Sequence, residues 1–304
     1  MSRASSCRAG PACALRGVRL ALWTGLAAAG GLAVAQTVSV RDDAGQEVRL
    51  AQPARRVVAL APNLVELAYD AGGGAALVAA VRYSDHPAEA KKLPRIGDAF
   101  ALNLEAIAQL RPDLVLVWQS GLPARQREQL RALGVPLYES EIRHVEDIAT
   151  TLERLGVLLG TRPVADAAAS SLRQRWQALQ SRYAKRAPVR VFYQLWQPPL
   201  MTVNGEHLVT QAIRACGGVN VFAALPTLTP TVGWEAVVRA NPQLVASARI
   251  DDQARMPPGR WPELTQIDAV RHARFALLPP EIDRMSPGFV DGAQALCEAI
   301  DKAR

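Results

Sequence analysis

Aromatic and charged side chains follow several short apolar runs in this sequence, and they are the residues best suited to ligand chemistry. Tyr83 and Trp118 come just past two such runs, and Trp196 comes just past a third. A ring with one polar edge offers a large flat face to a planar ligand. A fourth run leads into a segment that ends on a guanidinium, which can hold a carboxylate, amide or phosphate edge. The candidate ligand-binding residues are therefore Tyr83, Trp118, Trp196, Pro280, Glu281, Ile282, Asp283 and Arg284.

These residues also have simpler interpretations. Trp118 and Trp196 can each cap the core of their own domain without touching a ligand, and Arg284 can be a solvated surface residue. For either tryptophan, the sequence favours the two interpretations about equally.

Motifs of enzymatic catalysis are missing. The sequence has no P-loop, G-x-S-x-G, H-E-x-x-H or Cys-x-x-Cys, and its four histidines lack metal-ligand spacing. Glu105 and Glu235 would make a glycosidase pair only with their carboxyls roughly 5–10 Å apart. We therefore expect that the chain is not an enzyme and has no resident cofactor or metal. An exported hydrolase is the alternative from another functional class.

Glu105 and Glu235 belong to a repeated unit. Residues 103–117 read NLEAIAQLRPDLVLV and residues 233–247 read GWEAVVRANPQLVAS, so the two glutamates match at a spacing of 130 residues. Each copy predicts a short helix that opens on Glu, a turn marked by Pro, and an apolar strand. Two copies of one unit indicate two similar lobes.

A long amphipathic helix is predicted between the two copies, over residues 163–186. An apolar stripe recurs at three- and four-residue steps, and at ~1.5 Å per residue the helix is roughly 36 Å long. Alone, this pattern also fits a long core helix of a single domain, but its place between the repeats favours a stiff connection. The stripe residues are Val164, Ala168, Leu172, Trp176, Leu179 and Tyr183.

The apolar runs that position the candidate residues read as buried parallel strands separated by helices. A hairpin over Thr37–Val40 and Glu47–Leu50 precedes them. Ligands of open α/β sheets sit beyond the carboxyl ends of the strands, which is where the candidates lie. The predicted strands are Val57–Leu60, Leu77–Val81, Leu114–Val117, Val135–Tyr138, Arg190–Leu195, Leu244–Ala248 and Phe275–Leu278.

The predicted fold class is therefore α/β, with two Rossmann-like lobes that contain parallel sheets and are joined by a single long helix. The predicted segments are a leader over residues 1–35, an N-terminal lobe over 36–162, the linker helix over 163–186 and a C-terminal lobe over 187–304.

The leader has the features of a secretory signal peptide. Four arginines precede the apolar run Leu20–Val34, and Ala33-Val34-Ala35 predicts cleavage after Ala35 and export of the chain. A membrane anchor is the weaker interpretation, because the run has only about 15 residues. Without those arginines the chain has 31 basic and 28 acidic residues, a balance too even for a nucleic-acid-binding stripe.

Two cysteines remain after the leader. An even pair in an exported chain favours a disulfide between Cys216 and Cys297, with two buried free thiols as the alternative.

Six motifs in order resemble one known family. RVVALAPNLVELAYDAG, YSDHP, NLEAIAQLRPDLVLVW, RVFYQLWQPPL, ACGGVNVF and DRMSP resemble the periplasmic cobalamin-binding proteins of ABC importers, from about Arg56 to Leu296. The wider class has a helical backbone between its lobes and takes cobalamin, haem or iron–siderophore.

The resemblance implies a ligand in the cleft between the lobes, with Tyr83 and residues 280–284 against a corrinoid. It also implies that Cys216 pairs with Cys297, and that Glu105 and Glu235 dock on arginines of the permease. The expected partners are a small-molecule ligand and an inner-membrane ABC permease with its ATPase, and a monomer is expected.

The sequence departs from the family pattern at two positions. Aromatic residues expected before NLEAI and near TVGWE are replaced by Ala99 and Thr229, with Phe100 and Trp234 as neighbours. The alternative within the class is a haem or siderophore carrier, in which Tyr83 or His86 would be the candidate iron ligand.

Overall fold

The first sheet of this protein is built from short apolar strands that pair in parallel. The computed structural model describes residues 37–98, 101–249, 257 and 259–304. The strand order is β4-β3-β5-β6, and every neighbouring pair is parallel. Nearly all strand residues are buried, as expected for a parallel sheet covered on both faces. The strands are β3 (Val57–Ala59), β4 (Leu77–Ala80), β5 (Leu114–Trp118) and β6 (Leu137–Ser140).

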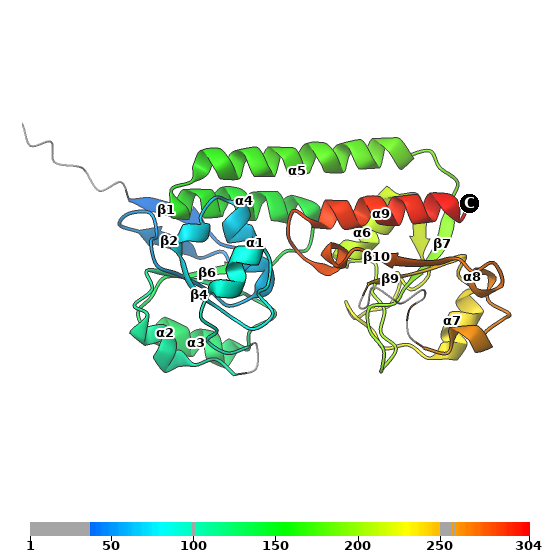
Figure 1. The fold of residues 1–304 in the computed structure, drawn as a ribbon, viewed down its shortest axis with the longest axis horizontal. Coiled ribbons are helices and arrows are strands. Elements are labelled where there is room, and N and C mark those ends of the chain that lie inside the picture. Colours follow the sequence, from blue (N-terminus) through cyan, green and yellow to red (C-terminus); the bar gives the residue numbers. More distant parts are fainter. Residues whose placement is uncertain (1–36, 99–100, 250–256, 258) are drawn as a thin grey trace, which may run out of the picture. The chain divides into compact units, whose positions relative to one another are not determined.

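The second sheet repeats this architecture. Its order is β10-β9-β7-β8, again with parallel pairs throughout. Figure 1 shows helices around each sheet, so the predicted fold class of two α/β lobes with parallel sheets is confirmed. The strands are β7 (Val189–Tyr193), β8 (Gly218–Asn220), β9 (Leu244–Ala248) and β10 (Phe275–Leu278).

The helices of the two lobes alternate with the strands, as the sequence predicts. In the first lobe they are α1 (Pro62–Asp70), η1 (Gly74–Ala76), η2 (Ala88–Lys92), α2 (Leu104–Gln109), α3 (Ala124–Ala132) and α4 (Val145–Leu159). In the second they are α6 (Leu208–Ala215), α7 (Trp234–Ala240), η3 (Trp261–Glu263), α8 (Asp268–Arg271), η4 (Pro280–Asp283) and α9 (Phe289–Lys302). The predicted hairpin is present as β1 (Val38–Arg41) and β2 (Glu47–Leu50), paired antiparallel.

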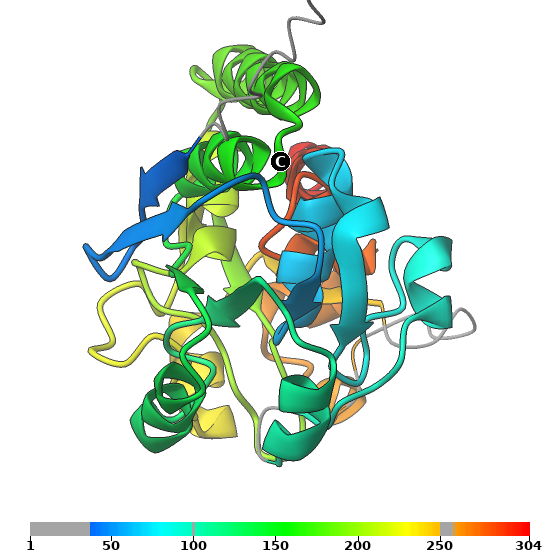
Figure 2. The same ribbon diagram turned by 90° about the vertical axis from the view of Figure 1, so that its left-hand side faces the viewer.

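Helix α5 (Arg162–Tyr183) spans 22 residues between the last helix of the first lobe and the first strand of the second. It lies along α4, as Figures 1 and 2 both show, and it also contacts α9. On the α9 side, the rings of Trp176 and Phe289 lie 6.2 Å apart between centroids, and Arg175 pairs with Asp291. The single long helix predicted near residues 163–186 is confirmed. The predicted segment boundaries themselves stay a prediction.

The predicted apolar stripe of α5 is wrong at its start. The side chain of Val164 is 53% exposed, and the buried positions there are Ala165 and Ala169. A β-carbon added at Gly156 of α4 would lie 2.4 Å from the Ala165 β-carbon, so the two helices approach very closely at this point. Close approach selects small residues, which an apolar-periodicity argument undervalues.

The duplicated unit is confirmed in atomic detail. Arg111, two residues past the end of α2, and Asn241, the residue after α7, match in the repeat and both have a left-handed backbone, with φ of 46° and 42°. In the first lobe Nε and Nη2 of Arg56 donate to the Leu110 carbonyl at 2.9 and 2.6 Å. In the second, the same two atoms of Arg190 donate to the Asn241 carbonyl at 3.1 and 3.0 Å. An arginine at the start of the neighbouring strand therefore bonds a carbonyl at the helix end in each copy, at positions one residue apart in the aligned units.

Two predicted strands differ from the structure by two residues at an end, and the other predicted strand bounds agree to within one residue. The fourth strand was expected at Val135–Tyr138, but β6 pairs over Leu137–Ser140, after Pro136. It extends through Glu139, which is buried between Arg127 and Arg131 and is bonded to the hairpin turn by a 3.2 Å hydrogen bond from its N–H to Asp42. The strand expected to reach Leu195 ends at Tyr193.

Cys216 and Cys297 form the expected disulfide, which joins the end of α6 to α9. The closed loop spans 81 residues, for which the chain-entropy model gives a stabilisation of roughly 4–5 kcal/mol. In the described ranges no helix is both long and apolar enough to cross a membrane. The predicted signal peptide, Ala99 and Phe100 lie outside the described residues.

Candidate functional site

A pocket of about 320 Å³ opens at the carboxyl ends of three neighbouring strands in the first lobe. The residues after β3 and β4 form two of its sides, and Trp118 at the end of β5 forms a third. This is the place where open parallel sheets bind ligands. Its lining is mainly apolar with a few polar groups, as in small-molecule sites. The lining residues are Leu60, Ala61, Pro62, Val81, Arg82, Tyr83, Asp98, Trp118 and Gly121.

Tyr83 is held in an unusual backbone conformation. Its φ is +65°, a left-handed value that costs a non-glycine residue on the order of 1 kcal/mol or more. The bonds around it keep it there: the Arg82 N–H donates to the Gly97 carbonyl at 2.9 Å, and Arg95 donates to the Ser84 carbonyl at 2.8 Å. The side chain of Tyr83 is 79% exposed. The loop therefore presents this ring outward at some conformational cost.

Trp118 lies half-buried as the last residue of β5, in register with Ser140. Gly121 crosses close to its ring, because a β-carbon at Gly121 would lie 2.0 Å from an indole carbon. Only glycine permits that approach, so the turn after β5 fixes the indole as a wall of the pocket. The structure thus brings Tyr83 and Trp118 together.

Trp196 lies in the second lobe, shortly after β7, and it does not line this pocket. Its side chain is 55% exposed, and its indole N–H donates to the Pro198 carbonyl at 3.1 Å. Within the described ranges, Tyr83 and Trp196 are the only large aromatic side chains that are exposed. Each follows a parallel strand, one in each lobe. Exposed rings at matching ends of two sheets are typical of a binding surface rather than of core packing.

The segment 280–284 is less free than its sequence suggests. Ile282 is 1% exposed and packs in the core, so its side chain anchors the segment. Arg284 Nη1 lies 3.5 Å from Glu66 on α1 of the first lobe and 3.5 Å from Glu281. The Ser286 hydroxyl donates to the same Glu66 carboxylate at 2.7 Å. Arg284 is therefore not a solvated surface residue, because it pairs with a carboxylate of the other lobe.

Sequence reasoning missed Glu66. A signal was available, since this acid interrupts the apolar run LVELA of α1 and needs a partner when that helix packs on its sheet.

Asp283 carries a second polar contact in the segment. Its carboxylate accepts a 2.5 Å hydrogen bond from the buried Tyr193 hydroxyl. Burial of the carboxyl raises the pKa of Asp283 to about 6, and the bond from Tyr193 partly offsets that rise. Burial also raises the pKa of Tyr193 well above its ordinary value. This pair holds the segment against β7, beside the start of the Trp196 loop.

Glu105 and Glu235 occupy the first turns of α2 and α7, where a carboxylate is favoured by the helix dipole. Both side chains belong to exposed residues. Helix α2 is capped independently, because the Asn103 side chain accepts the Ala106 N–H at 2.9 Å. Capping therefore does not require Glu105.

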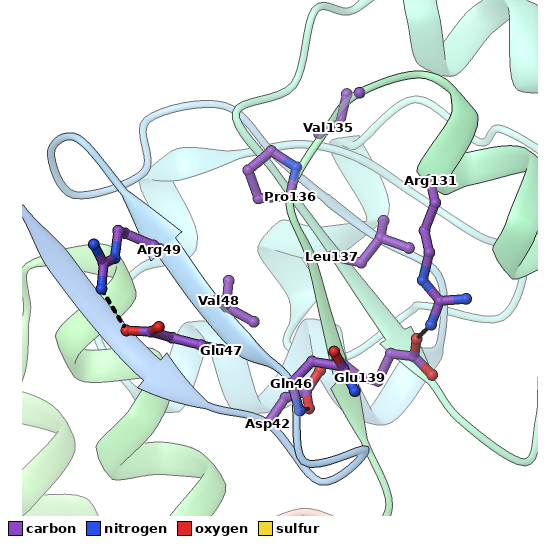
Figure 3. A pocket seen from close by; sticks show the side chains of 11 residues that line it. Asp42, Gln46, Glu47, Val48, Arg49, Arg131, Val135, Pro136, Leu137 and Glu139 are labelled. Atoms are coloured by element: carbon purple, nitrogen blue, oxygen red, sulfur yellow. Dashed lines mark hydrogen bonds and ion pairs between the residues drawn. The ribbon is translucent and has the colours of Figure 1, made fainter.

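Another pocket of about 460 Å³ lies between the β1–β2 hairpin and β6 (Figure 3). Charged side chains surround it as two pairs, Arg49 with Glu47 at 2.9 Å and Arg131 with Glu139. It contains none of the candidate residues and faces the amino-terminal half of β6. We therefore place the candidate site at the carboxyl ends of the strands instead. Over the described residues, no group of three His, Cys, Asp or Glu side chains is arranged to hold a metal ion.

Two α/β lobes with parallel sheets, one long connecting helix and a pocket at the strand ends define a solute-binding protein fold. The sequence model of the periplasmic binding protein family matches residues 57–282, and the chain belongs to that family.

Among its relatives, the vitamin B12-binding protein of Yersinia pestis (strain Pestoides F) is 36% identical over 250 residues, covering 82% of this chain and 88% of the relative. The crystal structure of the periplasmic vitamin B12 binding protein of Vibrio cholerae superimposes with a TM-score of 0.77 at 34% identity, covering 83% of this chain and 98% of that one. A periplasmic haem-binding protein from Pseudomonas aeruginosa superimposes with a TM-score of 0.69 at 25% identity, covering 81% and 92% of the two chains.

Proposed function

We propose that this protein is the substrate-binding component of an ABC importer and that it binds cobalamin or a related corrinoid between its lobes. The observation that carries this proposal is the placement of three aromatic side chains at strand ends, Tyr83 and Trp118 in one lobe and Trp196 in the other. Flat faces of this size suit a large planar macrocycle. The relatives named for vitamin B12 binding support a corrinoid as that macrocycle.

A haem or an iron–siderophore is the second candidate ligand. An exposed tyrosine in a strained loop is well placed to bind iron through its phenolic oxygen, and His86 is an exposed neighbour in the same loop. The haem-binding relative supports this alternative. Thr229, where the family pattern has an aromatic residue, is exposed and adds no ring to the site.

Direct titration distinguishes the candidates. The purified protein is titrated with cyanocobalamin, haemin and a ferric siderophore while tryptophan fluorescence is followed. A corrinoid carrier is expected to bind cyanocobalamin with the tightest affinity, and quenching should fall in Trp118→Phe and Trp196→Phe variants. Tighter binding of haemin would favour the second candidate, and binding of none of the three would contradict the proposed function.

The chain is exported to the periplasm and is cleaved after Ala35. The mature protein acts as a monomer without enzymatic activity and delivers its ligand to an inner-membrane permease with its ATPase. The intact mass of the protein recovered from the periplasm tests the cleavage site, and light scattering of the same sample tests the monomer. Glu105 and Glu235, on matching units of the two lobes, are the proposed contacts with the permease.

A further inference from the structure

Arg82 is a basic residue of the candidate site that the aromatic residues alone do not explain. It directly precedes Tyr83 and lines the same pocket. The pocket has nine lining residues, all within the described part of the chain, and Arg82 is the only cationic one among them. Its side chain is 66% exposed, so it is not a structural residue of the core. Its backbone N–H is fixed to the Gly97 carbonyl at 2.9 Å, which anchors the residue while the guanidinium stays outside.

The guanidinium is only loosely engaged. Its charged neighbour among the described residues is Asp98, with Nη1 and a carboxylate oxygen 3.8 Å apart. The guanidinium of Arg95, the next arginine in the sequence, is by contrast engaged in the loop. It donates to the Ser84 carbonyl at 2.8 Å and to Asp85 at 3.1 Å. An exposed pair as long as that of Arg82 contributes little to stability. Arg82 therefore keeps most of its capacity to bind an anion.

We infer that Arg82 is a specificity residue that binds an anionic oxygen group at the edge of the planar ligand stacked on Tyr83. This inference rests on the proposed function. The chemistry recognised is a phosphate or carboxylate oxygen, for which a guanidinium offers paired donors. In a corrinoid that group is the phosphodiester of the nucleotide loop, and in haem it is a propionate.

Paired ligands with and without the anion test the inference. Cyanocobalamin is compared with dicyanocobinamide, which lacks the phosphodiester, and haemin with its dimethyl ester, which lacks free carboxylates. Arg82→Gln is expected to weaken binding of the anionic ligand by about three- to tenfold, in whichever of the two pairs the protein binds. The affinity for the ligand of that pair that lacks the anion should stay unchanged. Arg82→Lys should retain most of the preference, and added salt should weaken the wild type more than Arg82→Gln.

Arg49→Gln is the matched control. Its side chain is also 66% exposed and also pairs with a single acid, Glu47, but it lies in the hairpin away from the site. It should leave every affinity unchanged.

The possible failures are separable. If the wild type binds one of the pairs and Arg82→Gln weakens both members equally or neither, the inference is wrong while the proposed function stands. If the wild type binds none of the four ligands, both are wrong.

Discussion

Tyr83 combines a left-handed backbone with a largely exposed ring, and neither feature contributes to core packing. The neighbouring backbone bonds to Gly97 and from Arg95 maintain it. Local strain of this kind is often found at functional sites, because the surrounding structure must hold it in place. At the scale of single residues, this side chain is therefore the most informative one to change.

Replacing Tyr83 with Ala should weaken ligand binding by roughly 1–3 kcal/mol, which is about ten- to hundredfold in dissociation constant, because a large apolar contact is lost. The melting temperature should stay unchanged, since the ring makes little contact with the core. Tyr83→Phe refines the result: a corrinoid needs only the ring, whereas an iron ligand needs the hydroxyl. Unaltered affinity of the Ala variant would place the site elsewhere, and a lower melting temperature would show that the ring supports the fold.

At the scale of elements, the N-cap residue of α6 is a histidine whose protonation the fold disfavours. His207 caps this helix by accepting the Val209 N–H on Nδ1 at 3.2 Å. Burial, together with the positive charge of Arg143, lowers the pKa of His207 to about 4. Arg143 belongs to the first lobe, pairs with Glu141 at 2.7 Å, and accepts a 2.7 Å bond from Gln211 of α6 on its carbonyl.

This cap predicts a loss of stability in mild acid. The unfolded chain protonates His207 below pH about 6.5, whereas the folded chain resists protonation until about pH 4. The stabilisation is therefore complete above pH 6.5 and is lost as the pH falls toward 4, with a limit of about 3 kcal/mol. Urea unfolding at pH 7 and pH 4.5 should show a larger loss for the wild type than for His207→Asn, which can still cap the helix.

The comparison with the variant is needed because two carboxyls act in the opposite direction. Burial raises the pKa of both Asp70 and Asp283 to about 6, so the folded chain takes up these protons more readily and gains stability as the pH falls through 6. Equal pH dependence of the wild type and His207→Asn would contradict the prediction for His207.

At the scale of the whole molecule, the lobes are connected by more than α5. Gln211 Nε2 bonds to the Arg143 carbonyl, and Glu66 receives both Arg284 and Ser286 from the second lobe. The connection between the lobes is therefore stiff, because a 22-residue helix is supplemented by these polar contacts from lobe to lobe.

We therefore expect only a small hinge motion when ligand binds. Small-angle scattering of the protein with and without saturating ligand should give nearly the same radius of gyration. A large decrease on binding would show that the polar contacts between the lobes open and that α5 is not a rigid connection.

Docking on a permease belongs to the same scale. Glu105→Ala with Glu235→Ala should leave the affinity for soluble ligand unchanged while it abolishes uptake and tight binding to permease-containing membranes, because such charges steer and orient a complex. Glu128→Ala with Glu298→Ala, two other exposed helix residues, is the control pair. Normal uptake by the Glu105 and Glu235 double variant would leave these residues with only their helix-dipole role.

Much of the architecture follows from local pattern. The apolar runs between Pro and Gly turns predict seven of the eight strands of the two sheets, and the repeat of residues 103–117 at 233–247 predicts the two lobes and the matching places of Glu105 and Glu235. The short strand β8 and the helix α4 were not predicted. Hydrophobic period and turn residues act over a few neighbours, so a single stretch of sequence contains them.

Other features depend on residues far apart in the chain. The buried face of α5 is set by the close approach of Gly156 to Ala165, which favours alanine over Val164. The partner of Arg284 is Glu66, 218 positions earlier, and the pocket joins Tyr83 to Trp118 across three strand ends. Each depends on how whole elements pack, because a side chain's partner is decided by the surface that packing brings against it, and no local pattern encodes that surface.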